Sequence, residues 1–372
     1  AEGRKKTAEE VQRLIDQGPF LPEAALQAGL VDEVVYEDQV TDRLRALTQS
    51  SRDIEGDDYS GISTTSLGLD RGPRIAVIYA TGTINSGRSG YDPLNGAIVG
   101  SETLIEYIRQ ARRDDSIRAI VVRIDSPGGS VSASDAIWRE LMIARRERAD
   151  RPIVASMSDL AASGGYYIAM PAEAIVAQPT TLTGSIGIFG GKFVTGGVYE
   201  NLGANIEATS IGRNAEMESP ARAYTPDEVG KLNEQLEAFY ATFIERAADS
   251  RHTTPDKIDQ IARGRVWTGR QALDVGLVDA LGGLDRAIAI AKERAKIPAE
   301  SGVQVVVYPP AKSFYQLLSD EISGVGEQAA IGRWLSANLS KGERDALRML
   351  RGPTAMFRRG ELLALMPFTF LR

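Results

Sequence analysis

One serine lies where a protein could use it as a nucleophile. Ser163 is in the segment 159–167 (DLAASGGYY), between the apolar run 153–157, which predicts a buried strand, and the apolar segment 164–170, which predicts a helix. A serine at such a turn presents its hydroxyl beside free backbone N–H groups and the positive end of the helix dipole. The small flanking residues let a substrate backbone come close. The pattern therefore indicates nucleophilic chemistry at Ser163.

A second glycine turn lies upstream, at 125–130 (DSPGGS), directly after the apolar run 119–124 that predicts another strand. A loop of this kind can offer backbone N–H groups to a developing negative charge. Two glycine turns around one serine therefore predict an oxyanion hole. Each turn alone is also typical of an ordinary strand–turn–helix connection, so the functional interpretation depends on the pair.

A serine nucleophile needs a base, and this chain offers few. Its single histidine, His252, lies in a polar stretch before a predicted helix, so a Ser–His–Asp arrangement is not expected. A Ser–Lys dyad is the remaining serine mechanism, and it needs a lysine whose pKa is lowered. Lys192 is a local candidate because it lies near the apolar run 186–189; on an exposed loop it would have no such role.

The composition is that of a globular protein, with 372 residues, 43% hydrophobic and 25% charged. A net charge of −7 without a basic block makes a nucleic-acid partner unexpected. The absence of cysteine excludes thiolate sites, and a single histidine disfavours a histidine-rich metal site. No metal or organic cofactor is expected, because a Ser–Lys dyad needs none. The apolar segment 362–371 is too short to span a bilayer, and we expect it to dock or pack.

One stretch of the chain occurs twice. The segment 25–32 (ALQAGLVD) recurs as 272–279 (ALDVGLVD), and 7–11 (TAEEV) resembles 254–258 (TPDKI), each typical of a helix N-terminus. The second copy ends a long body, whereas few residues precede the first. The pattern therefore predicts that 1–47 is the tail of an earlier repeat whose body is not in this chain. The alternative is a common helix–turn pattern that occurs twice by chance.

The rest of the chain divides into three parts. The segment 48–72, rich in serine, glycine and aspartate, predicts a linker. Strands and helices alternate over 73–300, which predicts an α/β domain with a parallel sheet and flanking helices; 301–372 is a C-terminal extension. Strands are predicted at 75–79, 119–124, 153–157 and 174–177, and helices at 103–112, 134–148, 164–170 and 225–250.

Five motifs in order now carry a resemblance: 126–130 (SPGGS), 162–166 (ASGGY), 182–187 (LTGSIG), 264–269 (GRVWTG) and 276–279 (GLVD). They resemble the signal peptide peptidase A family, also called protease IV. This is a family of bacterial membrane-bound Ser–Lys peptidases with a Clp-protease/crotonase-like fold. The resemblance covers 73–296, and 1–45 resembles the end of the preceding half in two-repeat members.

The resemblance implies a role for each matching residue. Ser163 would be the nucleophile, and Gly129 and Gly164 would supply the oxyanion N–H groups. Gly128 and Gly129 would hold the substrate backbone in an extended conformation. Ser185 would hydrogen-bond the lysine amine and orient it; the alternative is that Ser185 is an ordinary turn serine.

The lysine departs from the simple family pattern. In short members it falls in the loop that here reads 211–220 (IGRNAEMESP), where Ala215 stands at the matching position. Arg213 cannot replace it, because an arginine stays protonated. Long members place the lysine in the first repeat and the serine in the second. The resemblance therefore implies that this chain is a C-terminal part, with its base in a missing N-terminal half.

The resemblance implies a serine endopeptidase that degrades hydrophobic peptides such as cleaved signal peptides. The expected partners are those peptides, the missing half and identical subunits in a dome-like homo-oligomer. A membrane-attaching N-terminal segment outside this chain would place the protein on the outer, periplasmic face of a bacterial cytoplasmic membrane. The alternative is a non-catalytic scaffold that binds extended peptides by backbone pairing. A third interpretation, a crotonase-like acyl-CoA enzyme, is disfavoured because no basic site for the CoA phosphates is evident.

Overall fold

The computed structural model describes residues 1–48, 72–310 and 363–365. Short gaps within these ranges lie at 18–19, 21, 36, 93–95, 202, 204–205 and 211–213. The chain forms two compact units, Ala1–Leu67 and Gly68–Arg372. Most of the predicted linker, most of the predicted C-terminal extension and Arg213 lie outside the described residues.

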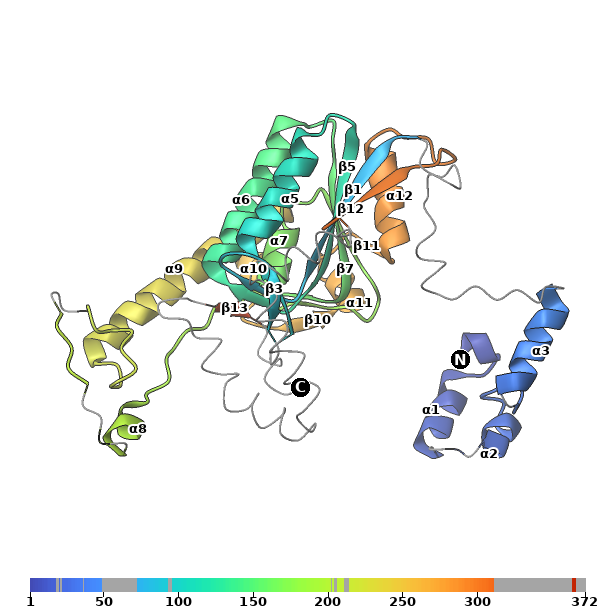
Figure 1. Ribbon diagram of the computed structural model, residues 1–372, viewed down its shortest axis with the longest axis horizontal. Helices are drawn as coiled ribbons and strands as arrows, with labels where there is room; N and C mark the ends of the chain where they lie inside the picture. Colours follow the sequence, from blue (N-terminus) through green and yellow to red (C-terminus); the bar gives the residue numbers. More distant parts are fainter. Residues whose placement is uncertain are drawn as a thin grey trace, which may run out of the picture. The chain divides into compact units, whose positions relative to one another are not determined.

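The main unit is built on an eight-stranded sheet (Figure 1). Its central path runs β10 (Val266–Thr268), β9 (Leu182–Gly184), β7 (Ile153–Ala162), β5 (Ile117–Ser126), β1 (Arg74–Thr81) and β12 (Gln304–Tyr308). β8 (Ala174–Ala177) pairs with β7, and β11 (Ala280–Leu281) pairs with β8. Every pair is parallel except β10 with β9. The expected α/β fold, a parallel sheet with flanking helices, is confirmed.

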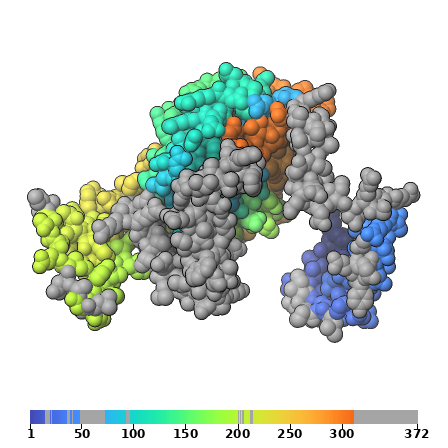
Figure 2. Space-filling view, in the orientation of Figure 1, coloured from blue at the N-terminus to red at the C-terminus, as the bar shows by residue number. Residues whose placement is uncertain are grey.

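Helices cover both faces of this sheet, which is why its central strands are almost continuously apolar. One face packs against α5 (Ser101–Arg113), α6 (Val131–Glu147) and α7 (Gly164–Ala169), and the other against α12 (Leu284–Arg294) (Figure 1). Residues of α5 and α6, teal in Figure 2, form a continuous surface over the first face. The strands thus meet two separate hydrophobic cores, which fix the positions of their carboxyl ends.

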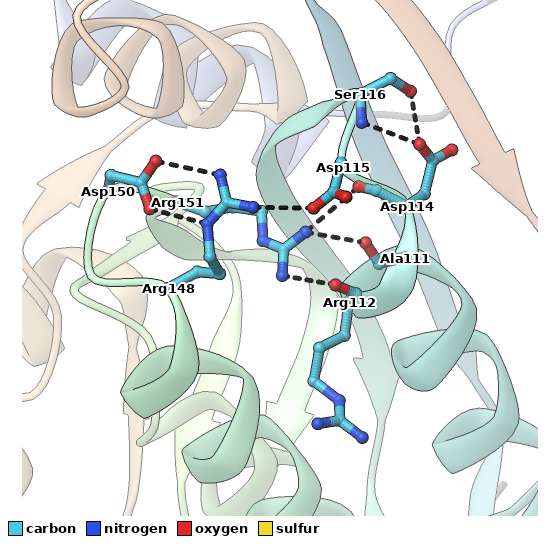
Figure 3. Close-up of polar contacts among 8 residues, drawn as sticks. All are labelled: Ala111, Arg112, Asp114, Asp115, Ser116, Arg148, Asp150 and Arg151. Carbon is cyan, nitrogen blue, oxygen red and sulfur yellow. Dashed lines mark hydrogen bonds and ion pairs between the residues drawn. The ribbon is translucent and has the colours of Figure 1, made fainter.

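A buried arginine joins β7 to this helix layer. Arg151, just before β7, is 1% exposed and donates hydrogen bonds to the carbonyls of Ala111, Arg112 and Asp114 at the end of α5 (Figure 3). These carbonyls have no intrahelical partner, and a cation there also complements the helix dipole. Arg151 therefore ties the segment just before β7 to the last turn of α5.

A second, five-stranded sheet lies at the carboxyl end of β5. Its order is β13 (Leu363–Leu365), β6 (Gly128–Ser130), β2 (Thr83–Asn85), β4 (Gly96–Gly100) and β3 (Gly90–Asp92). The sequence did not predict these strands, because segments of three to five residues are too short to show a hydrophobic period. The sheet places β6 against α7.

The remaining helices are α8 (Gly196–Asn201), α9 (Pro226–Ser250), α10 (Pro255–Ile261) and α11 (Gly269–Asp274). The strand predicted at 174–177 is β8, with the same ends. The strands predicted near β1 and β5 and the helices predicted near α5, α6, α7 and α9 are present with shifted ends. Two boundaries need correction. β7 continues to Ala162 rather than ending at residue 157, and the sheet includes β12, so the α/β domain extends beyond residue 300.

The N-terminal unit contains η1 (Glu2–Arg4), α1 (Ala8–Gln17), α2 (Pro22–Gln27) and α3 (Glu37–Thr48). Helices α1, α2 and α3 begin 247 residues before α10, α11 and α12, respectively. Ion pairs and positive backbone angles recur at the same offset. They are Arg4–Asp32 (2.6 Å) with Arg251–Asp279 (2.5 Å), Lys5 (φ 51°) with His252 (φ 52°), and Gly29 (φ 69°) with Gly276 (φ 79°). The internal repeat is therefore a repeat of structure as well as of sequence.

Candidate active site

Ser163 occupies a strained turn between a strand and a helix. β7 ends at Ala162 and α7 begins at Gly164, so Ser163 is the N-cap of α7. Its backbone angles, φ 54° and ψ −115°, are costly for a residue with a Cβ atom. Hydrogen bonds hold this backbone on both sides: the Ser163 N–H donates to the Gly184 carbonyl and the Tyr167 N–H donates to the Ser163 carbonyl, each at 2.8 Å. A strained serine at a strand-to-helix turn is the geometry of a nucleophile elbow.

The Ser163 side chain is held loosely. It is buried, and its hydroxyl donates to the carbonyl of Gly187 over 3.5 Å, which is a long and weak hydrogen bond. Gly164 follows as the first residue of α7, and the N–H groups of a first helical turn have no intrahelical partner. The hydroxyl and a helix N-terminus therefore lie together, as the sequence predicts.

The turn after β5 lies next to the turn that contains Ser163. Ser126 at the end of β5 is in register with Ala161 of β7, and a Cβ atom on Gly165 would lie 2.6 Å from the Ser126 carbonyl oxygen. Only glycine fits at this contact between the two turns. The carboxyl ends of neighbouring parallel strands are where α/β proteins bind ligands.

β6 supplies the two upstream glycines. Gly128 and Gly129 have φ values of 98° and 155°, and a Cβ atom on Gly129 would lie 2.0 Å from the Ile84 carbonyl oxygen of β2. The Gly128 N–H donates to the Ser126 hydroxyl at 3.1 Å. That N–H is therefore used locally, which leaves Gly129 as the oxyanion donor that the resemblance assigns to this turn. The contact from Ser126 was not foreseen from the sequence.

Ser185 lies beside Ser163 across a pair of strands. It follows β9, whose Thr183 and Gly184 pair with Ala161 and Ala162 of β7. Its φ is 47°, and its N–H donates to the Arg265 carbonyl at 2.7 Å. The arginine and tryptophan of the 264–269 motif thus position Ser185. β10 pairs with β9, and a Cβ atom on Gly184 would lie 2.8 Å from the Trp267 ring. The structure therefore brings the two predicted serines together.

A cavity of about 350 Å³ opens next to Ser185. Its lining consists of Ser185, Gly187, Ile188, Phe189, Tyr240, Arg263 and Gly264. The carbonyl of Gly187 also accepts the hydrogen bond from the Ser163 hydroxyl, so the cavity lies close to Ser163. Tyr240 donates to Asp259 at 2.7 Å, and burial together with this carboxylate raises the pKa of Tyr240 to about 12. The cavity has mainly apolar walls with a neutral tyrosine and an arginine at its edge.

None of the positions considered for the base, which are Lys192, Ala215 and His252, is in recorded contact with Ser163 or Ser185 among the described residues. Lys192 donates to the Met217 carbonyl at 2.6 Å and lies 4.3 Å from the Tyr224 ring centre, and desolvation lowers its pKa. No contact recorded among the described residues joins Lys192 to Ser163 or Ser185. Ala215 is exposed in a turn, and His252 is exposed at the end of α9. Within the described ranges, no cluster of histidine, cysteine, aspartate or glutamate could hold a metal ion.

A polar cluster behind α7 was also missed by sequence reasoning. Tyr167 donates to Asp135 at 2.9 Å, Arg246 contacts both, and its guanidinium stacks 3.7 Å from the Trp138 ring centre. Their spacing carries no pattern that links α6, α7 and α9, so only the fold could bring them together. The cluster anchors α7, the helix that Ser163 caps.

Comparison with known proteins agrees with the sequence motifs. The model of peptidase family S49 matches residues 145–298. The chloroplastic serine protease SPPA of Arabidopsis thaliana is 39% identical over 95% of this chain and 52% of its own length. Protease 4 of Salmonella typhi is 45% identical over 61% of this chain and 36% of its own length. The chain thus spans about half, or less, of the length of these curated relatives.

Two further comparisons concern shorter proteins. A putative protease of Synechocystis sp. is 33% identical over 56% of this chain and 70% of its own length. A serine-to-alanine mutant of a membrane-bound stomatin-specific protease, a solved structure, is 18% identical with a TM-score of 0.40, covering 65% of this chain and all of that one. Among the described helices, none is long and apolar enough to cross a membrane. The family match and these relatives, which include SPPA and Protease 4, show that the chain belongs to peptidase family S49.

Proposed function

We propose that the protein is a serine endopeptidase with Ser163 as its nucleophile. The observation that carries this proposal is the strained N-cap conformation of Ser163, with β6 on one side and Ser185 on the other. Strain of this kind persists in proteins where the surrounding structure holds it for a function. Membership of family S49 supports the same reaction.

The chemistry follows from the arrangement of the site. The Ser163 Oγ attacks a peptide carbonyl carbon while its proton passes to a base. The oxyanion that forms accepts hydrogen bonds from the N–H groups of Gly164 and Gly129. The leaving amine takes the proton, and water then hydrolyses the acyl-enzyme by the same route. The substrate backbone pairs with β6 in an extended conformation.

The base in this proposal is a lysine from a preceding repeat, which makes a Ser–Lys dyad. The cavity beside Ser185 has the apolar walls that keep a lysine amine neutral, and Ser185 would orient that amine. Lys192 is not chosen, because its recorded contacts are with Met217 and Tyr224.

The first copy of the repeat supports a preceding body. In the main unit, Ile258, Ala272, Leu277, Ala287 and Ala291 are buried in the cores of the α/β domain. Their counterparts 247 residues earlier are not: Val11, Ala25 and Leu30 are half-buried, and Val40 and Leu44 are exposed. Apolar residues that cover a core in one copy need the same cover in the other. We therefore infer that residues 1–47 close an earlier α/β body in the full-length protein.

Hydrophobic peptides, including cleaved signal peptides, are the proposed substrates. Attachment to a bacterial cytoplasmic membrane on its outer face and assembly into a homo-oligomer belong to the same proposal. These points rest on the family resemblance. A second candidate, a non-catalytic peptide-binding protein, is favoured by the lack of a basic side chain in recorded contact with Ser163 among the described residues.

The test is turnover of a hydrophobic peptide ester by the full-length protein. Ser163→Ala should lower kcat at least a thousandfold and abolish labelling by a peptidyl fluorophosphonate, because it removes the attacking atom. Ser210→Ala, a change at an exposed surface serine, is the matched control and should leave both unchanged. Undiminished turnover by the Ser163→Ala protein would refute the proposed role, and a full-length protein without any turnover would favour the second candidate.

A further inference from the structure

A segment near the C-terminus of the chain pairs with β6. β13 runs antiparallel to it, with Leu363 opposite Ser130, Ala364 opposite Gly129 and Leu365 opposite Gly128. On its other side, β6 pairs with β2 through Ile84. Both edges of β6 are therefore occupied within this chain.

The position of β13 matters because of its neighbours. It also contacts α7, the helix that Ser163 caps. An extended segment thus lies between the strand that carries Gly128 and Gly129 and the helix that starts at the nucleophile. An added antiparallel strand on an exposed sheet edge is the usual way in which extended peptides bind.

Two peptides cannot pair with the same edge of β6 at once. A tethered segment has a high effective concentration, so it competes with a free peptide even when each backbone contact is weak. The sequence of 361–372 (ELLALMPFTFLR) is a hydrophobic peptide, the substrate class proposed above. The pairing of β13 with β6 and the hydrophobic composition of 361–372 are therefore both those expected of a bound substrate.

From this pairing we propose that the C-terminal segment containing β13 is an intramolecular inhibitor of the peptidase. Bound to β6, β13 occupies the edge on which substrate would pair, and its release opens the site. This inference rests on the proposed function of β6 as the peptide-binding strand. It also gives a role to the apolar segment 362–371, which the sequence analysis expected to dock.

Binding tests the inference without any need for turnover. The probe is a fluorescein-labelled peptide with the sequence of 361–372, and its anisotropy is measured with the Ser163→Ala chain, either intact or ending at Glu361. The shortened chain should bind about tenfold more tightly, because the tethered competitor is gone. A probe of the same length and order with aspartate in place of its leucines serves as the peptide control.

A second variant keeps the chain length constant. Leu363→Pro with Ala364→Pro removes two successive backbone N–H groups, which point to opposite sides of a strand, so one donor towards β6 is lost. This protein should bind the probe like the shortened chain. Thr369→Pro with Phe370→Pro, outside β13, is the matched control and should bind like the intact chain.

The outcomes separate this inference from the proposed function. Equal binding by the intact, shortened and proline-substituted chains would overturn the inhibitor but leave β6 as a peptide site. Absence of binding to every chain would overturn both. In the full-length protein, removal of 362–372 should lower KM for a hydrophobic peptide ester; Ser163-dependent loss of the segment on incubation would make it a substrate and contradict the inhibitor.

Discussion

Ser163 and Ser185 both have a positive φ, which serine rarely adopts. Their φ values are 54° and 47°, and each lies directly after a strand of the same sheet. Backbone hydrogen bonds to Gly184 and Arg265 hold these angles against their cost. At the scale of the residue, the site is therefore built by placing two hydroxyls on backbones that the surrounding strands force into position.

This strain predicts a gain in stability when Ser163 is replaced by glycine. Glycine adopts φ 54° and ψ −115° without a Cβ clash, so Ser163→Gly should raise the free energy of unfolding by about 1 kcal/mol, after allowance for the entropy that glycine loses on folding. Ser163→Ala loses the same hydroxyl but keeps the clash, and it should show no such gain. Thermal unfolding of the two variants measures the difference; equal Tm values would show that the turn is not strained.

At the scale of the element, the ends of α5 and α9 depend on charged side chains. Arg151 serves the carbonyls of α5 from the start of β7 (Figure 3). α9 begins with a capping box between Thr225 and Glu228. Arg222 donates two hydrogen bonds of 2.7 Å to the Glu228 carboxylate. Both contacts connect a helix terminus to a neighbouring segment.

Arg151→Met should lower the free energy of unfolding by about 3 kcal/mol, because it leaves buried carbonyls of α5 without their donor. Arg148→Met is the control: Arg148 makes ion pairs with Asp115 and Asp150 at the surface, and its loss should have little effect. Urea unfolding compares the two variants. Similar midpoints for Arg151→Met and the unchanged protein would show that the contact with α5 contributes little.

Glu228 predicts part of the acid sensitivity of α9. The hydrogen bonds from Arg222, followed by those from Thr225, lower the pKa of Glu228 to about 2. Because the folded pKa is below the unfolded one, the stabilisation is complete above about pH 4.5 and is lost as the pH falls towards 2. Glu228→Gln should flatten the dependence of Tm on pH in this window.

Glu234→Gln, which removes an exposed partner of Lys231 on the same helix, should leave the pH dependence of Tm as it was. If both variants follow the profile of the unchanged protein, the capping box does not contribute to acid unfolding.

At the scale of the whole molecule, the sequence predicted the long strands and helices better than the short strands and loops around the candidate site. The long strands and helices have clear hydrophobic periods, and the repeat can be recognised in the amino-acid sequence without the structure. The end of β7 was placed too early because Ser158 and Asp159 interrupt its apolar run, although both belong to the strand. The strands from β2 to β4 and the cavity beside Ser185 depend on contacts between distant segments, which no local period encodes.

The central claim also concerns the whole molecule: Ser163 works with a base that an earlier repeat supplies. The most direct measurement compares fluorophosphonate labelling of Ser163 and hydrolysis of a hydrophobic peptide ester by the 372-residue chain and by the full-length protein. The account predicts that the full-length protein labels and turns over, whereas the shorter chain does so at least a hundredfold more slowly. Equal rates for the two proteins would contradict it and would place the base within this chain, with Lys192 the first residue to replace.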